Sequence, residues 1–284
     1  MKIIIGKNAG FCYGVKRAVE GAENILNENN NKAFCLGELV HNKEVIKDLE
    51  SKGITFIEEL NPNLSNVILR AHGIPKKTYE YMKENNIYYY DFTCPNVLNI
   101  HKIASEYAQK GYFIFLLGDS KHPENLGTIS FCGKDSLIIE NKEDLNNAIE
   151  KFKASKLKKL LVIEQTTFSI KNFEDIVVSI KNIVRFDYEL VIKNTICNAT
   201  GLRQKETEEL SKKVQYMIII GGKNSSNTKK LYDIASRNCK NTISIENESE
   251  LNLEEIKKFD VIGIMAGAST PQSSINEVKK ILEN

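Results

Sequence analysis

The sequence has few of the features that mark membrane, secreted or nucleic-acid-binding proteins. No apolar run approaches the length of a membrane-spanning helix. The opening residues 1–6 are too short for the apolar region of a secretory signal, and no small-residue cleavage site follows them, so we expect a cytoplasmic protein. The net charge is only +2, which gives no reason to expect binding to nucleic acid or to a membrane surface.

The six cysteines contain no closely spaced C-x-x-C pair. Structural zinc sites usually draw ligands from such pairs, so their absence argues against a site of that kind. Disulfides are rare in the cytoplasm, which leaves metal ligation or catalysis as the uses to consider. Low-complexity linkers are also missing, and we therefore expect the parts of the chain to pack tightly around one shared centre.

Cys94 lies between an aromatic, strand-like run at 87–90 and an amphipathic helical run at 97–110. Pro95 suits the first position of a helix, so Cys94 is expected at the N-cap, where the helix dipole favours a thiolate. Cys12 and Cys197 lie at similar junctions, and after Cys197 we expect a helix over about 201–214. The remaining cysteines show no such placement and are interpreted as core or surface thiols: Cys35, Cys132 and Cys239.

Each cysteine junction is followed by two further polar junctions after strand-like runs. The first lies 28 or 29 residues after the cysteine, and the second lies 60 or 72 residues after it. The first set is His41, His122 and Ser225, and the second set is His72, Thr166 and Ser269. This pattern indicates an internal threefold repeat. It suggests boundaries at 1–93, 94–193 and 194–284, and leaves open whether residues 1–11 pair with the third part.

Strands alternate with helices throughout, which predicts an α/β fold of three similar small units with largely parallel sheets. Ligands of such sheets lie beyond the carboxyl ends of the strands, where all nine junction residues fall, so one shared pocket is expected. Three cysteines there suit a cubane iron–sulfur cluster with one iron left open to bind a substrate oxygen. A buried free thiol is the ordinary interpretation of any single cysteine, but three at one place in a repeat favour ligation.

The polar junctions resemble an anion site. Ser225, Ser226 and Asn227 open a helix after a glycine turn, which suits a phosphate, although serine and asparagine are also ordinary N-caps. Three of the four histidines lie at junctions and suit anion binding or proton donation, whereas His101 lies inside a helix. Glu124 is either a favourable charge in a first helical turn or a proton donor.

Two neighbouring threonines and one lysine complete the candidate set. Thr166 or Thr167 could relay or orient the proton of Glu124. Lys223 could be a plain turn cation or could add positive potential near an anion. The residues alone leave these choices open.

These residues lie in motifs that resemble the IspH/LytB family of 4-hydroxy-3-methylbut-2-enyl diphosphate reductases, in order and over nearly the whole chain. The motifs are Phe11-Cys12-Tyr13-Gly14-Val15, Val40-His41-Asn42, Ala71-His72-Gly73, Thr93-Cys94-Pro95, His122-Pro123-Glu124, Gln165-Thr166-Thr167, Ile196-Cys197-Asn198-Ala199-Thr200, Lys223-Asn224-Ser225-Ser226-Asn227 and Ala266-Gly267-Ala268-Ser269. The resemblance implies a trefoil of three α/β domains around a 4Fe–4S cluster. It also implies the terminal step of the methylerythritol phosphate route to isoprenoids, yielding isopentenyl and dimethylallyl diphosphate.

The resemblance also implies roles for individual residues. Cys12, Cys94 and Cys197 would hold three irons. Glu124 would be the proton donor, and Thr166 would orient the substrate hydroxyl, with Thr167 as the alternative. The diphosphate would be held by His41, His72, His122, Ser225, Ser226, Asn227 and Ser269, and Thr166 and Thr167 would also bind the substrate. A ferredoxin or flavodoxin is the expected electron donor.

Two other classes of function remain open from the sequence. One is an iron–sulfur dehydratase of another small phosphorylated substrate, which would use the open iron without net electron transfer. The other is a non-enzymatic iron–sulfur redox sensor. A diphosphate-type pocket and Glu124 argue against the sensor, and dependence on a reductant separates the reductase from the dehydratase.

Overall fold

The structure is a computed structural model that describes residues 1–29, 32–184 and 187–284. It divides into two compact bodies. The terminal body comprises residues 1–20, 40–52 and 198–284, and the central body comprises residues 21–39 and 53–197. The three-part division expected from the repeat, at 1–93, 94–193 and 194–284, stays a prediction.

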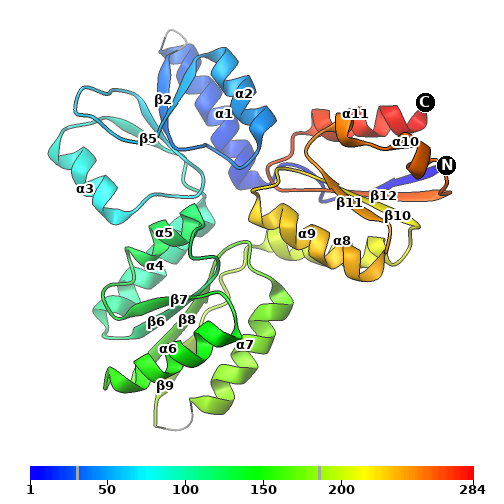
Figure 1. Ribbon diagram of the computed structural model, residues 1–284. Coiled ribbons are helices and arrows are strands. Elements are labelled where there is room, and N and C mark those ends of the chain that lie inside the picture. The colour runs from blue at the N-terminus through cyan, green and yellow to red at the C-terminus, as the bar shows by residue number, and fades with distance from the viewer. Residues whose placement is uncertain (30–31, 185–186) are drawn as a thin grey trace. The chain divides into compact units, whose positions relative to one another are not determined.

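The terminal body contains one parallel sheet of four strands in the order β1-β12-β10-β11. Its strands are β1 (Lys2–Ile5), β10 (Tyr216–Ile220), β11 (Thr242–Ile245) and β12 (Val261–Ala266). The first strand of the chain thus pairs with the last, with Ile4 opposite Gly263. Residues at the start of the chain therefore complete a sheet that is otherwise built from the last quarter of the sequence (Figure 1).

The central body contains two parallel sheets of four strands each. One has the order β3-β2-β4-β5 and the other has the order β7-β6-β8-β9. The strands of the first are β2 (Ala33–Leu36), β3 (Ile54–Ile57), β4 (Val67–Leu69) and β5 (Tyr89–Asp91). The strands of the second are β6 (Phe113–Leu117), β7 (Ser136–Ile139), β8 (Lys159–Glu164) and β9 (Glu189–Ile192). The predicted α/β class and parallel sheets are confirmed.

All three sheets share one strand order. The second strand lies at one edge, followed by the first, the third and the fourth, and in the terminal body β1 takes the fourth place. The strand order reverses between the first and third strands, which run side by side. In an open parallel sheet this reversal leaves a crevice at the carboxyl ends of these two strands, where ligands bind. Each sheet therefore has one such reversal, at which a ligand is expected.

Helices cover both faces of the sheet in the terminal body, as Figure 1 shows. Alternate residues of β10 explain this arrangement: Ile218 and Ile220 belong to a core cluster with α11, whereas Met217 and Ile219 belong to one with α8 and α9. The helices of this part are α1 (Tyr13–Glu28), whose second half lies in the central body, α2 (Lys43–Lys52), α8 (Asn198–Ser211), α9 (Ser226–Asn238), α10 (Leu253–Ile256) and α11 (Gln272–Glu283), with a 3₁₀ turn at η1 (Glu248–Glu250).

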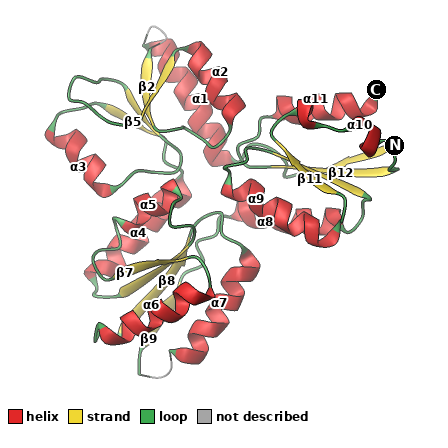
Figure 2. Ribbon diagram, viewed as in Figure 1, coloured by secondary structure: helices red, strands yellow, loops and turns green. Residues whose placement is uncertain are grey.

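The sheet around β6 is also covered on both faces (Figure 2). Phe113, Phe115 and Leu117 pack with α6 and α7, while Ile114 and Leu116 pack with α4. The helices of the central body are α3 (Lys76–Glu84), α4 (Pro95–Gln109), α5 (Pro123–Ile129), α6 (Lys142–Ala154) and α7 (Ile170–Ile183). Among the described residues, no helix combines the length and the hydrophobicity that crossing a membrane requires.

The helix expected over about 201–214 was placed too late in the sequence. It is α8, which begins at Asn198, directly after Cys197. Its first turns lack a continuous apolar stripe because the side chains that it buries there are polar: Thr200, Arg203 and Gln204. A search for apolar periodicity misses such a helix start.

Candidate active site

Each of the three junction cysteines directly precedes the first residue of a helix: Cys12 precedes α1, Cys94 precedes α4 and Cys197 precedes α8. Each also follows the fourth strand of its sheet. The backbone N–H of each cysteine donates a hydrogen bond to a carbonyl in the loop after the third strand. The acceptors, in the same order, are Ala268 at 3.0 Å, Ala71 at 2.9 Å and Thr166 at 3.1 Å. The three junctions are therefore equivalent in backbone structure.

The environments of the six cysteines fall into two groups. Cys12, Cys94 and Cys197 are partly exposed, and the backbone N–H of Val15 points to the sulfur of Cys12 at 3.5 Å. The other three are buried, and burial raises the pKa values of Cys35 and Cys132 to about 12, which keeps these thiols protonated. Metal ligation requires an accessible thiolate, so the junction cysteines fit a metal cluster and the buried cysteines do not.

Glu124 and Thr166 form a buried pair in the central body. The Glu124 side chain is in the first turn of α5 and is 2% exposed. Its Oε1 accepts the backbone N–H of Thr166 at 2.6 Å, and its Oε2 accepts the Thr166 hydroxyl at 2.7 Å. The first-turn position of Glu124 alone would not require burial or these long-range partners. The contacts thus favour a specific role over simple dipole stabilisation.

Burial raises the pKa of Glu124 to about 7, and the two hydrogen bonds from Thr166 only partly oppose this shift. An ordinary exposed glutamate would be almost fully ionised at neutral pH. Glu124 instead holds a proton on a substantial fraction of molecules at pH 7. This protonation equilibrium suits a group that donates a proton during a reaction.

His122 and His72 lie together in the central body, with ring centroids 5.4 Å apart in an edge-to-face arrangement. His122 is the N-cap of α5, and its Nδ1 accepts the backbone N–H of Glu124 at 3.2 Å. Because Nδ1 is an acceptor, the proton of the neutral ring is on Nε2. The donor group of the neutral His122 ring is therefore its Nε2–H.

Backbone hydrogen bonds identify which of the two threonines occupies the same position of the repeat as His72 and Ser269. The carbonyl of Thr166 accepts the N–H of a junction cysteine, as the carbonyls of Ala71 and Ala268 each do. Thr166 therefore corresponds to these two alanines. It is Thr167 that corresponds to His72 and Ser269, one residue later than the spacing suggested. The side chain of Gln165 donates to the Thr167 hydroxyl at 2.9 Å. The Thr166 side chain is thus an addition peculiar to this sheet, and it is the one that contacts Glu124.

In the terminal body, the loops that carry His41, Ser225 and Ser269 approach one another closely. The Ser269 hydroxyl donates to the backbone carbonyl of His41 at 3.0 Å. Gly222, in the loop before Ser225, lies so near the same carbonyl that a Cβ atom there would be only 2.7 Å from it. Ser225 is the N-cap of α9, and its Oγ accepts the N–H of Thr228 at 3.3 Å. Glycine at 222 is therefore required for these loops to meet.

Asn227, in the first turn of α9, is 3% exposed. Neither its amide oxygen nor its amide nitrogen has a hydrogen-bond partner among the residues that the structure describes. An unsatisfied buried amide is costly, and native proteins rarely keep one without a reason. A polar ligand at the start of α9 would satisfy Asn227, where Ser226 is also partly exposed.

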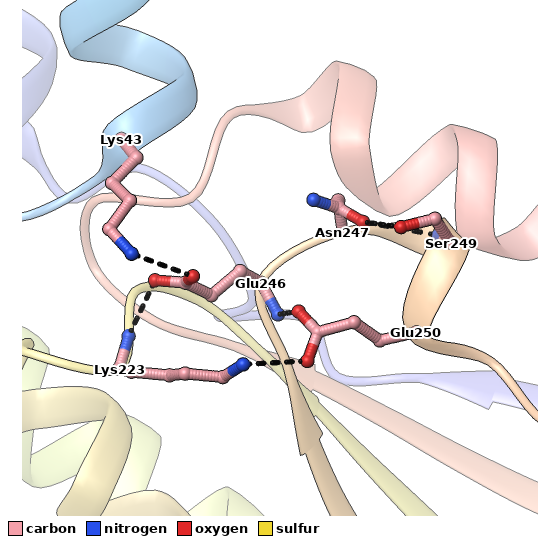
Figure 3. Close-up of polar contacts among 6 residues, drawn as sticks. All are labelled: Lys43, Lys223, Glu246, Asn247, Ser249 and Glu250. Carbon is pink, nitrogen blue, oxygen red and sulfur yellow. Dashed lines mark hydrogen bonds and ion pairs between the residues drawn. The ribbon is translucent and has the colours of Figure 1, made fainter.

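The side-chain ammonium group of Lys223 forms an ion pair with a glutamate, as Figure 3 shows. Its Nζ pairs with Glu250 at 2.8 Å, and its backbone N–H donates to Glu246 at 3.0 Å. Lys43, at the start of α2, pairs with the same Glu246 at 3.2 Å. Of the two interpretations of Lys223, the structure favours a turn cation that fixes the loop before Ser225.

Sequence reasoning missed a second buried carboxyl, Glu164, at the end of β8. It is fully buried and accepts the backbone N–H groups of Thr195 at 2.6 Å and Ile196 at 3.2 Å. Burial raises its pKa to about 7. A glutamate at the end of an otherwise apolar strand, Leu160–Ile163, was the only available signal in the sequence.

The candidate residues are divided between the two bodies, and the single shared pocket expected for them stays a prediction. The group in the central body is Cys94, Cys197, His72, His122, Glu124, Thr166 and Thr167. The group in the terminal body is Cys12, His41, Ser225, Ser226, Asn227 and Ser269. In both bodies the residues lie in loops that follow strands or at the helix starts after them.

Comparison with known proteins gives concordant results. The family described as LytB protein matches residues 3–283. A 4-hydroxy-3-methylbut-2-enyl diphosphate reductase of Caldanaerobacter subterraneus subsp. tengcongensis is 44% identical over 283 residues, covering 98% of this chain and 95% of the relative. A reductase of the same name from Clostridioides difficile is 40% identical over 286 residues, covering 100% of both chains.

Solved structures agree with the sequence relatives. The structure of the E-1-hydroxy-2-methyl-but-2-enyl-4-diphosphate reductase from Plasmodium falciparum matches with a TM-score of 0.91 at 31% identity, covering 100% of this chain and 88% of that one. A structure of (E)-4-hydroxy-3-methyl-but-2-enyl diphosphate reductase, described as the terminal enzyme of the non-mevalonate pathway, matches with a TM-score of 0.70 at 37% identity, covering 100% and 99%. From its junction cysteines, its strand order and these full-length matches, we conclude that the chain belongs to the LytB protein family.

Proposed function

We propose that this protein reduces 4-hydroxy-3-methylbut-2-enyl diphosphate to isopentenyl diphosphate and dimethylallyl diphosphate. The carbon–oxygen bond of the allylic hydroxyl breaks, and the oxygen leaves as water after taking up one proton. Two electrons from an external reductant and a second proton go to the carbon skeleton. The balanced reaction therefore consumes two electrons and two protons and releases one water molecule.

Membership of the family implies an iron–sulfur centre, and the donor set of this chain fits one. In the proposal, Cys12, Cys94 and Cys197 hold three irons of a 4Fe–4S cluster and leave one iron without a protein ligand. Such a cluster would pass on the electrons of the external reductant and would provide Lewis acidity at the site of bond cleavage. The three partly exposed cysteines at equivalent helix starts support this role, because a metal ligand must be accessible.

The diphosphate is assigned to hydrogen-bond donors among the candidate residues. The buried amide of Asn227 has no hydrogen-bond partner among the described residues, and His122 accepts the N–H of Glu124 at Nδ1, so the donor of its neutral ring is Nε2–H. Both groups suit a strong acceptor such as a phosphate oxygen. The other groups assigned to the diphosphate are His41, His72, Ser225, Ser226 and Ser269, and Thr167 is assigned to the substrate without a specified atom.

The buried pair of Glu124 and Thr166 is the observation that carries the proposal. Its carboxyl has a pKa of about 7, and the Thr166 hydroxyl lies 2.7 Å from Oε2. A proton on Glu124 can therefore pass through the Thr166 hydroxyl to a neighbouring oxygen. We assign to Glu124 the proton that leaves with the substrate hydroxyl as water, and to Thr166 the orientation of that hydroxyl.

The reductant and the location of the protein complete the proposal. A ferredoxin or flavodoxin is the proposed electron donor, since the reaction needs electrons that the substrate does not supply. A cytoplasmic location agrees with partly exposed thiols that must stay reduced.

Anaerobic turnover tests the proposal directly. The protein is reconstituted with iron and sulfide, and oxidation of a reduced viologen is followed after addition of 4-hydroxy-3-methylbut-2-enyl diphosphate. We expect substrate-dependent oxidation with formation of both five-carbon diphosphates. A sample that carries an intact cluster but shows no oxidation would contradict the proposal and would favour an iron–sulfur dehydratase or a redox sensor.

The pH dependence of turnover should follow the ionisation of Glu124. Its pKa is raised to about 7, so the protonated form that can donate is present below this pH and is lost as the pH rises through it. Turnover should therefore fall above pH 7, by up to about tenfold for each further pH unit. The measurement is kcat against pH with saturating substrate and reductant. A profile that stays flat to pH 9 would remove Glu124 as the donor.

A further inference from the structure

Two side chains of α8 hold the loop that carries Cys12. This loop, residues 6–12, connects β1 to α1 and is called the Cys12 loop below. The carboxylate of Glu206 accepts the backbone N–H groups of Lys7 at 2.6 Å and Asn8 at 2.8 Å. It also accepts the side-chain amide of Asn8 at 2.9 Å. One carboxylate thus makes three bonds to two consecutive residues of the loop.

Arg203 holds the same loop nearer to the cysteine. Its guanidinium donates to the backbone carbonyl of Gly10 at 2.5 Å and to that of Ala199, in its own helix, at 3.0 Å. The side chain is only 4% exposed. A buried guanidinium is costly unless it makes good hydrogen bonds, so a position like this indicates a specific structural purpose.

The backbone at Gly10 is constrained as well as held. Its φ angle is +97°, in the region that favours glycine, and a Cβ atom there would lie 3.4 Å from the backbone oxygen of Thr270. Two residues later the N–H of Cys12 donates to Ala268. The Cys12 loop is therefore fixed by α8 on one side and by the loop after β12 on the other.

The buried face of α8 contributes Leu210 to the core cluster of Met217 and Ile219, but it is also suited to holding this loop. Its buried side chains are mostly polar: Thr200, Arg203, Gln204, Thr207 and Ser211, with Leu210 as the apolar member. A helix that packs only against a sheet normally buries an apolar stripe. The polar face instead offers hydrogen-bonding groups to a loop whose backbone polar groups need partners. The same helix begins directly after Cys197.

We propose that Arg203 and Glu206 are positioning residues for Cys12. They hold the Cys12 loop in the conformation that presents the thiol, through hydrogen bonds within the protein. In consequence, α8, which begins directly after Cys197, fixes the loop that carries Cys12. The effect on a cluster rests on the proposed role of Cys12 as a ligand, but the effect on the loop does not.

The test compares cysteine reactivity in the metal-free, full-length protein. Wild type, Glu206→Ala and Arg203→Lys are treated with iodoacetamide under anaerobic conditions, and the alkylation rates of Cys12 and Cys94 are measured separately by peptide mass spectrometry. Glu208→Ala is the matched control, because Glu208 lies on the exposed side of α8 and pairs there with Lys212 at 2.6 Å. Cys94 serves as an internal reference for global loosening.

We expect the Cys12 rate to change by about tenfold in Glu206→Ala and in Arg203→Lys, because each loses charge-assisted hydrogen bonds to the loop. The Cys94 rate should stay within about twofold of wild type, which is the size of effect that a neutral surface substitution has. Glu206→Gln keeps one carbonyl acceptor and should lie between wild type and Glu206→Ala. A Cys12 rate unchanged in both variants, or an equal change at Cys94, would overturn the proposal.

Cluster retention gives a second readout that separates this inference from the proposed function. After reconstitution, the variants should lose iron to a chelator about tenfold faster than wild type and Glu208→Ala. If wild type never acquires a cluster, the proposed function fails, while the alkylation rates still decide whether α8 positions Cys12. If alkylation responds and iron loss does not, Cys12 is positioned but is not a ligand.

Discussion

Replacing Cys94 by serine is expected to abolish the iron–sulfur centre and all reductase activity with it. Cys94 is the N-cap of α4, and its own N–H donates a hydrogen bond to the backbone carbonyl of Ala71. A serine hydroxyl stays protonated at neutral pH and is a poor ligand for iron, whereas a thiolate at a helix start is a good one. The variant should fold, because the hydrogen bond of residue 94 is made by its backbone. Iron and sulfide content after anaerobic reconstitution is the measurement.

The same substitution at a buried cysteine provides the control. Cys132 is 1% exposed, and its thiol donates to the carbonyl of Thr128, a bond that a serine hydroxyl can also make. Cys132→Ser should therefore keep wild-type levels of iron and sulfide. Wild-type iron and sulfide in Cys94→Ser would remove Cys94 from the ligand set.

Glu124→Gln should keep the cluster and lose most turnover. The amide cannot donate the acidic proton, and loss of a general acid typically costs about 10²–10⁴-fold in rate. The shape of the site is retained, because the glutamine oxygen can still accept the backbone N–H of Thr166, which lies 2.6 Å from the carboxylate in the wild type. The measurement is kcat with reduced viologen at pH 7, normalised to iron content.

Glu164→Gln is the matched control for this experiment. Glu164 is a second buried carboxyl with a pKa of about 7, and like Glu124 it accepts backbone N–H groups, but among the described residues its carboxylate makes no hydrogen bond to Thr166. Its amide variant tests for general effects of neutralising a buried carboxyl, and its kcat should stay within about threefold of wild type. Near-normal kcat in Glu124→Gln, or an equal loss in both variants, would contradict the assignment of Glu124.

The sequence by itself determined the α/β class and the places of the cysteine junctions. Alternating apolar strands and amphipathic helices leave few other folds, and Pro95 and Pro123 locate two helix starts almost to the residue. The resemblance to the reductases likewise came from local motifs. These features depend on short stretches of chain, where backbone preference and hydrophobic period act directly.

Only the tertiary structure decided which residues contact one another. The sequence could not choose between Thr166 and Thr167, because both follow the same strand, but the fold brings Thr166 to Glu124, 42 residues away in the chain. It also paired Lys223 with Glu250, which no local signal indicated.

The most distant contacts were the least visible in the sequence. Glu206 reaches Lys7 across 199 residues because β1 joins the sheet of the last strands and so brings the Cys12 loop beside α8. The α8 helix itself was placed late because its buried face is polar. Hydrogen bonds between side chains and a distant backbone leave no period in the sequence, so their partners follow only from the folded chain.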